Sequence, residues 1–135
     1  MTAPRILIVD DEAENLSRLC ATLRAGGWDV ATATCGRDAL ESVRSNRPHA
    51  IILDMVMPEM DGFEVARLLK SDPDFRSIPI VAATSLAASA DRARCLAAGC
   101  DDYLAKPFTT EQLQRRLAVL FPDGKRSTQG GRKLL

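Results

Sequence analysis

The stretch IILDMVMPEMDG, residues 51–62, places a carboxylate directly after a run of apolar side chains. Residues 50–53 show no polar alternation, which is typical of a β-strand covered on both faces. Asp54 follows this run at once, although a carboxylate normally prefers water. Asp61, with Glu64 three residues later, predicts the start of a helix. The stretch therefore predicts a buried strand, an acidic strand end and a helix in succession.

The same alternation of short apolar runs and helical patterns continues along the chain. Further strands are predicted at residues 5–9, 29–33, 78–83 and 102–105. Apolar side chains at helical spacing follow each strand; in the fourth helix these are Ala90, Ala93 and Ala97. Strands that alternate with helices imply parallel pairing through right-handed crossovers. The sequence therefore predicts a doubly wound α/β domain with a five-stranded parallel sheet of order 2-1-3-4-5 and five helices.

Helix ends carry their own signals in this sequence. Gly26-Gly27 follows the first helix, and Gly99 follows the fourth. The pair Thr109 and Gln112 has capping-box spacing and predicts the start of the fifth helix. Gly62 is expected to adopt a backbone conformation that other residues resist.

Length and composition limit the classes of function. The chain has 135 residues, the usual size of one domain, and its 18 basic and 18 acidic residues leave no formal net charge. This balance argues against direct binding of nucleic acid. Residues 1–121 are expected to form the folded domain. Residues 122–135 are rich in glycine and basic side chains and are expected to be a flexible tail.

Neither a secretory signal nor a membrane span is visible in the sequence. The four cysteines form no CxxC pair and are expected to be reduced thiols in or near the core. We therefore expect a cytoplasmic protein without a membrane partner.

Acidic side chains follow two of the predicted strands. Asp10 and Asp11 follow the first strand and Asp54 follows the third, which is its neighbour in the predicted order. Ligands bind at the carboxyl edge of such sheets, so these three carboxylates should converge there. Alone they would repel one another, and a hard cation such as Mg²⁺ resolves the conflict.

Two further groups belong to the same edge. Thr84 ends the fourth strand and Lys106 follows the fifth. A hydroxyl and an ammonium group both bind phosphoryl oxygens. Each signal alone has an ordinary structural explanation, since Asp10 and Asp11 could simply cap a helix. Together they indicate phosphoryl transfer to Asp54 as nucleophile.

At this point the chain resembles a known family, the receiver domain of two-component response regulators, which has a flavodoxin-like fold. The motifs are ILIVDDE, IILDMVMPEMDGFE, IPIVAATS and AGCDDYLAKPF, and the resemblance runs from Arg5 to about Phe121. It implies that Asp54 is the phosphoacceptor. It also implies that Mg²⁺ is held by Asp10 or Asp11, by Asp54 and by the backbone carbonyl of Val56. Thr84 and Lys106 are expected to contact the phosphoryl group, and the bond before Pro107 is expected to be cis. The resemblance further implies that Thr84 and Tyr103 form a conformational switch.

The resemblance further implies partners and a course of events. A histidine kinase or phosphotransfer protein donates the phosphoryl group. The surface of the fourth helix, fifth strand and fifth helix then changes, and a downstream protein or output domain reads it. The same face makes a homodimer plausible. In this reading the chain is a signalling domain and not an enzyme, with only self-phosphorylation and self-dephosphorylation.

The residues two positions after Asp54 and Thr84 are Val56 and Leu86, in the path of the hydrolytic water in receivers. Neither can orient water, so the sequence predicts slow self-dephosphorylation.

Two other classes of protein compete with this interpretation. A phosphatase of the haloacid dehalogenase-like type would use a second acid two residues after its nucleophile, where this chain has Val56. A flavodoxin-like cofactor protein would need a hydroxyl- or glycine-rich phosphate loop after the first strand. The segment Asp10-Asp11-Glu12 has the wrong charge for a bare phosphate.

Overall fold

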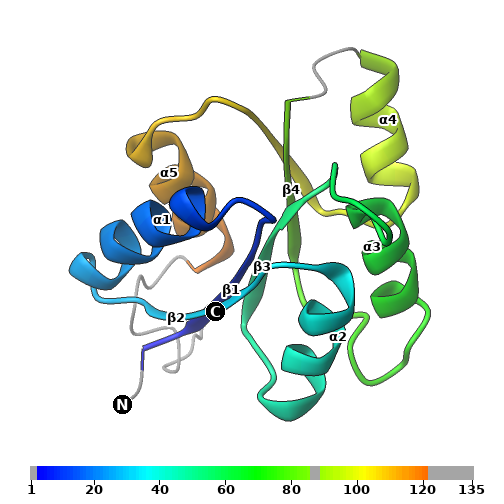
Figure 1. Cartoon of the computed structure of the whole chain (residues 1–135), viewed down its shortest axis with the longest axis horizontal. Helices are drawn as coiled ribbons and strands as arrows, with labels where there is room; N and C mark the ends of the chain where they lie inside the picture. Colours follow the sequence, from blue (N-terminus) through cyan, green and yellow to red (C-terminus); the bar gives the residue numbers. More distant parts are fainter. Residues whose placement is uncertain (1–2, 86–88, 122–135) are drawn as a thin grey trace.

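The computed structural model describes residues 3–85 and 89–121, and these form one parallel sheet flanked by helices (Figure 1). The sheet order is β2-β1-β3-β4-β5, with all neighbouring strands parallel, as predicted. Its strands are β1 (Arg5–Val9), β2 (Asp29–Ala33), β3 (Ala50–Asp54), β4 (Ile80–Thr84) and β5 (Asp102–Ala105). The predicted tail at 122–135 and the side chain of Leu86 lie outside the described residues.

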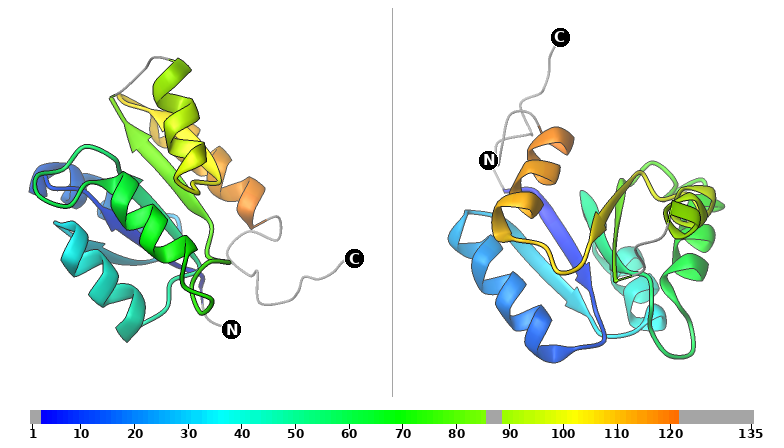
Figure 2. Two further views of the ribbon diagram at one scale, coloured as in Figure 1. Left: turned by 90° about the vertical axis from the view of Figure 1, so that its right-hand side faces the viewer. Right: turned by 90° about the horizontal axis from the view of Figure 1, so that it is seen from above.

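Five helices cover the two faces of the sheet. They are α1 (Ala13–Ala25), α2 (Gly36–Ser45), α3 (Gly62–Lys70), α4 (Ser89–Ala97) and α5 (Thr110–Leu120). Helices α1 and α5 cover one face, and α2, α3 and α4 cover the other (Figures 1 and 2). Each face has its own apolar core against the sheet. None of the helices in the described part of the chain is long and apolar enough to cross a membrane.

The predicted helix ends are confirmed by their hydrogen bonds. Asp61 caps α3, because its Oδ1 accepts from the Glu64 backbone N–H at 3.0 Å. Thr109 and Gln112 form the full capping box at the start of α5, with side-chain to backbone distances of 3.1 and 2.8 Å. The first helix ends before Gly26, as the glycine pair predicted.

Three strand boundaries differ from the prediction, and the smallest difference is that strand β4 ends at Thr84 and not at residue 83. Strand β4 begins at Ile80 and not at residue 78, because Pro79 has no N–H and only its carbonyl pairs, accepting from Ile51 N at 3.0 Å. Strand β3 extends through Asp54, which pairs with Ala83. The nucleophile candidate is therefore part of the sheet itself and not of the loop that follows it.

The alanines that marked the fourth helix do not form its buried face. Ala90, Ala93 and Ala97 are all exposed, whereas Cys95 and Ala98 are buried in the core. Helical spacing of small residues located the helix correctly, but an alanine side chain is too small to determine which face is covered.

The cysteines are free thiols, as expected, and three of them are buried. Burial raises the pKa of Cys20, of Cys95 and of Cys100, in the last case to about 12. Cys35 is less buried and caps α2, with its Sγ 3.5 Å from the Asp38 backbone nitrogen.

Candidate functional site

The carboxyl edge of the sheet brings together polar residues from four strands. Asp10 follows β1, Asp54 ends β3, Thr84 ends β4 and Lys106 follows β5. The register pairs Asp54 with Ala83 and Thr84 with Ala105, so the strand ends lie level with one another. Asp10, Asp54 and Thr84 are the buried polar residues of the described chain. Burial of two carboxylates at one edge needs an electrostatic explanation.

The predicted acidic cluster is present. Asp10, Asp11 and Asp54 each offer one carboxylate oxygen, and these three oxygens lie within 4.8 Å of one another. Asp10 and Asp54 are buried, whereas Asp11 is exposed. Carboxylate oxygens at this separation are the hard ligands that Mg²⁺ takes, with water and substrate oxygens completing its shell. The donor set therefore fits Mg²⁺.

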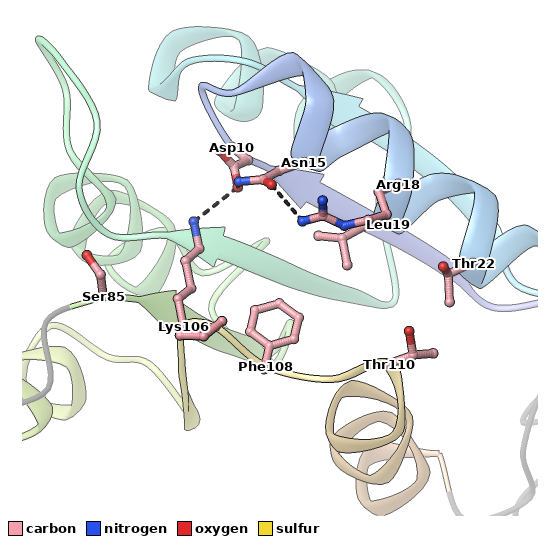
Figure 3. A pocket seen from close by; sticks show the side chains of 10 residues that line it. Asp10, Asn15, Arg18, Leu19, Thr22, Ser85, Lys106, Phe108 and Thr110 are labelled. Carbon is pink, nitrogen blue, oxygen red and sulfur yellow. Dashed lines mark hydrogen bonds and ion pairs between the residues drawn. The ribbon is translucent and has the colours of Figure 1, made fainter.

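Lys106 joins the cluster from β5. Its Nζ lies 3.1 Å from Asp10 Oδ2 (Figure 3). The same atom lies 3.4 Å from Asp54 Oδ2. Burial by itself would lower the pKa of Lys106, but the charges and hydrogen bonds of Asp54 and Asp10 outweigh it, so this pKa is raised. The side chain is therefore a fixed cation between the two buried carboxylates.

The pKa of Asp54 is raised, mainly because burial disfavours its charged form. Asp10 adds to the shift by repulsion. The Val56 backbone N–H, which donates to Asp54 Oδ1 at 3.1 Å, and the Lys106 cation both act in the opposite direction. An ionised Asp54 thus remains only partly compensated by protein groups, and a bound cation would supply the remainder.

The two predicted switch residues lie in different places. Thr84 is buried at the end of β4, and its carbonyl accepts from the Lys106 backbone N–H at 2.8 Å. Tyr103 is half-buried on β5, packs against the core under α2, α3 and α4, and has the Arg92 guanidinium 5.8 Å from its ring centre. The structure therefore brings Thr84 to the edge of the site, whereas Tyr103 lies toward α4.

The loop after β3 corrects one sequence-based expectation. Gly62 does not adopt a left-handed conformation; in the described chain the residues that do are Gly27, Glu59 and Gly99. A Cβ at Gly62 would instead lie 2.5 Å from the Asp54 carbonyl oxygen and 2.6 Å from Met55 Cα. Glycine is needed there because α3 starts against the backbone of the nucleophile candidate. The predicted cis bond between Lys106 and Pro107 is present.

A cavity of about 280 Å³ lies beside the cluster, between α1 and the segment after β5 (Figure 3). Its lining contains Asp10, Lys106 and Ser85 at one end, with Arg18 and Phe108 further along. Ser85, whose role no motif in the sequence indicates, is exposed and lines this cavity.

Asn15 and Arg18 also lie near this site, although no motif in the sequence marks them. Asn15 Nδ2 donates to Glu12 Oε1 at 2.5 Å, and Arg18 donates to Asn15 Oδ1 at 2.8 Å. The signal that could have found them is spacing, because residues three apart on a helix are neighbours on its surface.

Comparisons with known proteins agree on one family. A family model described as the response regulator receiver domain matches residues 6–118. The chain is 42% identical over 121 residues to the transcriptional regulatory protein PrrA of Mycobacterium bovis, a match that covers 89% of this chain and 51% of that protein. The chain thus spans about half the length of this curated relative.

Solved structures show the same likeness. The chemotaxis protein CheY4 of Vibrio cholerae superposes with a TM-score of 0.84 at 30% identity, covering 88% of this chain and 99% of that one. The receiver domain of the sensor histidine kinase PA1611 of Pseudomonas aeruginosa has a TM-score of 0.81 at 37% identity, covering 88% and 98%. That structure holds a magnesium ion in its active-site cleft.

Proposed function

The chain belongs to the family of response regulator receiver domains, and on this basis we propose that Asp54 accepts a phosphoryl group from a phosphohistidine in a Mg²⁺-dependent reaction. Receiver domains are signalling modules of two-component systems and not enzymes of the ordinary kind. The donor is a histidine kinase or a phosphotransfer protein. The observation that carries the proposal is the contact of the buried Asp54 carboxylate with Lys106 inside an acidic cluster.

The reaction needs little covalent chemistry from the protein. An Asp54 carboxylate oxygen forms a bond to phosphorus while the bond from phosphorus to the donor imidazole nitrogen breaks, and the electron pair stays on that nitrogen. Asp10, Asp11, Asp54 and the Val56 carbonyl would hold Mg²⁺, which neutralises charge on the transferred oxygens when bound. Lys106 offers its ammonium group to the same oxygens. Thr84 offers its hydroxyl to the phosphorylated Asp54 from the neighbouring strand.

The rival phosphatase function has less support. It requires a proton donor two residues after the nucleophile, and the Val56 side chain there is apolar and 51% exposed. The same side chain cannot orient a hydrolytic water, so we propose that the phosphoryl group on Asp54 is lost slowly. Rapid loss of phosphate from the isolated phosphoprotein would contradict this part of the proposal.

The primary test is phosphorylation in the absence of a kinase. The protein is incubated with Mg²⁺ and a small phosphodonor, and intact mass is measured by mass spectrometry. We expect a gain of one phosphoryl group that survives acid, is lost in base, and is absent in Asp54→Ala. The matched control is Asp38→Ala, an exposed acid of α2 that should be phosphorylated as the wild type is. Phosphorylation of Asp54→Ala, or repeated turnover of a phosphate ester, would overturn the proposal.

We further propose that activation changes the surface of α4, β5 and α5, with Thr84 and Tyr103 as the coupled switch. This surface exposes Leu96 and Val119, the latter to 73%, and carries an ion pair between Arg116 Nη1 and Asp102 Oδ2 at 3.6 Å. A downstream protein, an output domain or a second copy could bind there. Size-exclusion chromatography with and without a phosphoryl mimic tests the homodimer. We expect a dimer only with the mimic and none in Arg116→Glu, whereas a monomer in every sample would reject dimerisation.

The absence of direct nucleic-acid binding stays a prediction for residues 1–121. The relative named transcriptional regulatory protein is about twice as long as the matched segment, so its output belongs to that whole protein. A cytoplasmic location is likewise part of our proposal, because histidine kinases phosphorylate response regulators there.

A further inference from the structure

Asn15 lies between two acidic side chains at the start of α1. Its Nδ2 donates to Glu12 Oε1 at 2.5 Å. The same nitrogen lies 3.5 Å from Asp10 Oδ2 (Figure 3). The first contact is short, and the second is at the limit of a hydrogen bond. The Asn15 amide nitrogen therefore donates mainly to the Glu12 carboxylate.

Arg18 determines which way the Asn15 amide faces. Its Nη2 donates to Asn15 Oδ1 at 2.8 Å (Figure 3). The opposite orientation would turn the amide NH₂ toward the guanidinium and the amide oxygen toward two carboxylates, which is unfavourable on both sides. Arg18 thus selects the orientation in which Asn15 donates to Glu12.

Glu12 starts close to the acidic cluster but does not join it. Its backbone N–H donates to Asp10 Oδ1 at 2.9 Å, and its side chain makes no capping bond to α1. In the part of the chain that the structure describes, the group able to hold a metal consists of Asp10, Asp11 and Asp54, without Glu12. The Glu12 carboxylate instead accepts the hydrogen bond from Asn15 on α1.

We propose that Asn15, oriented by Arg18, is a specificity-determining residue that keeps Glu12 out of the ion site. The site then offers three carboxylates, which suits Mg²⁺, an ion that binds few protein ligands in a strict octahedral geometry. A fourth carboxylate would favour Ca²⁺, which takes more oxygen ligands in a looser geometry. The inference rests on the proposed function only in that the acidic cluster binds a divalent cation.

The test measures the affinities for Mg²⁺ alone and for Ca²⁺ alone, followed through the NMR shift of the Val56 amide, which is bonded to Asp54. Asn15→Ala should raise the ratio of Ca²⁺ affinity to Mg²⁺ affinity roughly tenfold, the lower end of the effects seen for groups that orient metal ligands. Arg18→Ala should shift the ratio in the same direction by less. Thr22→Ala, which lines the same cavity one turn beyond Arg18, is the control and should leave the ratio unchanged.

The double variant identifies the cause. In a Glu12→Ala background, Asn15→Ala should no longer change the ratio, because the side chain at position 12 then has no oxygen to offer the ion. An unchanged ratio in Asn15→Ala, or an equal change with and without Glu12, would overturn the inference. These outcomes leave phosphorylation of Asp54 untouched, whereas failure of the wild type to bind either ion would remove the Mg²⁺ site and this inference together.

Discussion

At the scale of single residues, folding buries the Asp54 carboxylate and so disfavours its charged form. Burial raises the pKa of Asp54 above its ordinary value of 3.8, and the neighbouring Asp10 adds to the rise. The folded protein therefore binds a proton at Asp54 more tightly than the unfolded chain does. Below the pKa of Asp54 in the unfolded chain, Asp54 does not lower the free energy of unfolding. As pH rises from that value to the higher pKa of the folded protein, Asp54 lowers the free energy of unfolding progressively. Above the folded pKa the destabilisation no longer increases.

Asp54→Asn should therefore raise the free energy of unfolding at neutral pH in the absence of Mg²⁺. The gain should shrink as pH falls toward 3.8, because wild-type Asp54 then becomes neutral as well. Urea titrations at a series of pH values measure this, with Asp38→Asn on the exposed side of α2 as control. Addition of Mg²⁺ should stabilise the wild type more than the variant. A gain that is independent of pH would show that charge at Asp54 is not the cause.

Gly62→Ala should destabilise the protein by about 1–3 kcal/mol, because the new Cβ would overlap the backbone of the nucleophile. The nearest atom to that Cβ, the Asp54 carbonyl oxygen, is only 2.5 Å away. The control is Gly26→Ala, where the nearest atoms stand at 3.4 Å, an ordinary contact distance. Chemical denaturation compares the two variants. Equal effects would mean that close approach at Gly62 is not what requires glycine.

At the scale of elements, short local signals determine where the functional side chains lie. Asp61 begins α3 seven residues after Asp54, and Thr109 begins α5 three residues after Lys106. Each cap thus fixes the far end of a loop whose near end carries a site residue. The buried residues Leu113 and Leu117 then anchor α5 to the core next to α1.

Thr109→Ala should lower the free energy of unfolding by about 1 kcal/mol, the usual effect of losing an N-cap side chain. The neighbouring exposed Thr110, the first residue of α5, provides a matched control as Thr110→Ala. Urea denaturation gives the stability, and phosphorylation by the small phosphodonor shows whether the Lys106 segment has moved. Stability equal to that of Thr110→Ala would contradict the importance of the capping box.

At the scale of the whole molecule, one sheet separates two apolar cores. Trp28 and Leu113 belong to the core beside α1 and α5, whereas Leu53 and Leu69 belong to the core beside α2, α3 and α4. Because strands of the same sheet contribute side chains to both cores, we expect the two to unfold together.

Leu69→Ala tests this coupling, since Leu69 is buried and lies on the face opposite the single tryptophan. The substitution should destabilise the protein by about 2–5 kcal/mol, the range for leucine truncation in a core. Trp28 fluorescence and far-ultraviolet circular dichroism should show the same shifted midpoint. A fluorescence midpoint that stays at the wild-type value would mean that the two cores unfold separately.

The sequence by itself determined the order of strands and helices, the parallel sheet and the chemical groups at its carboxyl edge. The signals are the apolar periodicity, the capping residues and the acids at the ends of β1 and β3. They can be recognised in the sequence because each depends only on residues that are close together in the chain. Because the carboxyl ends of parallel strands meet at one edge, the same signals predict that Asp10, Asp11, Asp54 and Lys106 lie near one another.

Only the tertiary structure decided the contacts between segments far apart in the chain. It places the Lys106 ammonium group beside the carboxylates of Asp10 and Asp54. It also shows that glycine is required at position 62 because the backbone of Asp54 lies so close, and not because of the backbone angles of Gly62. It also exposed the alanines of α4 and turned the Asn15 amide toward Glu12. These features depend on contacts that form only when helices and strands pack together, and a local sequence pattern does not determine such contacts.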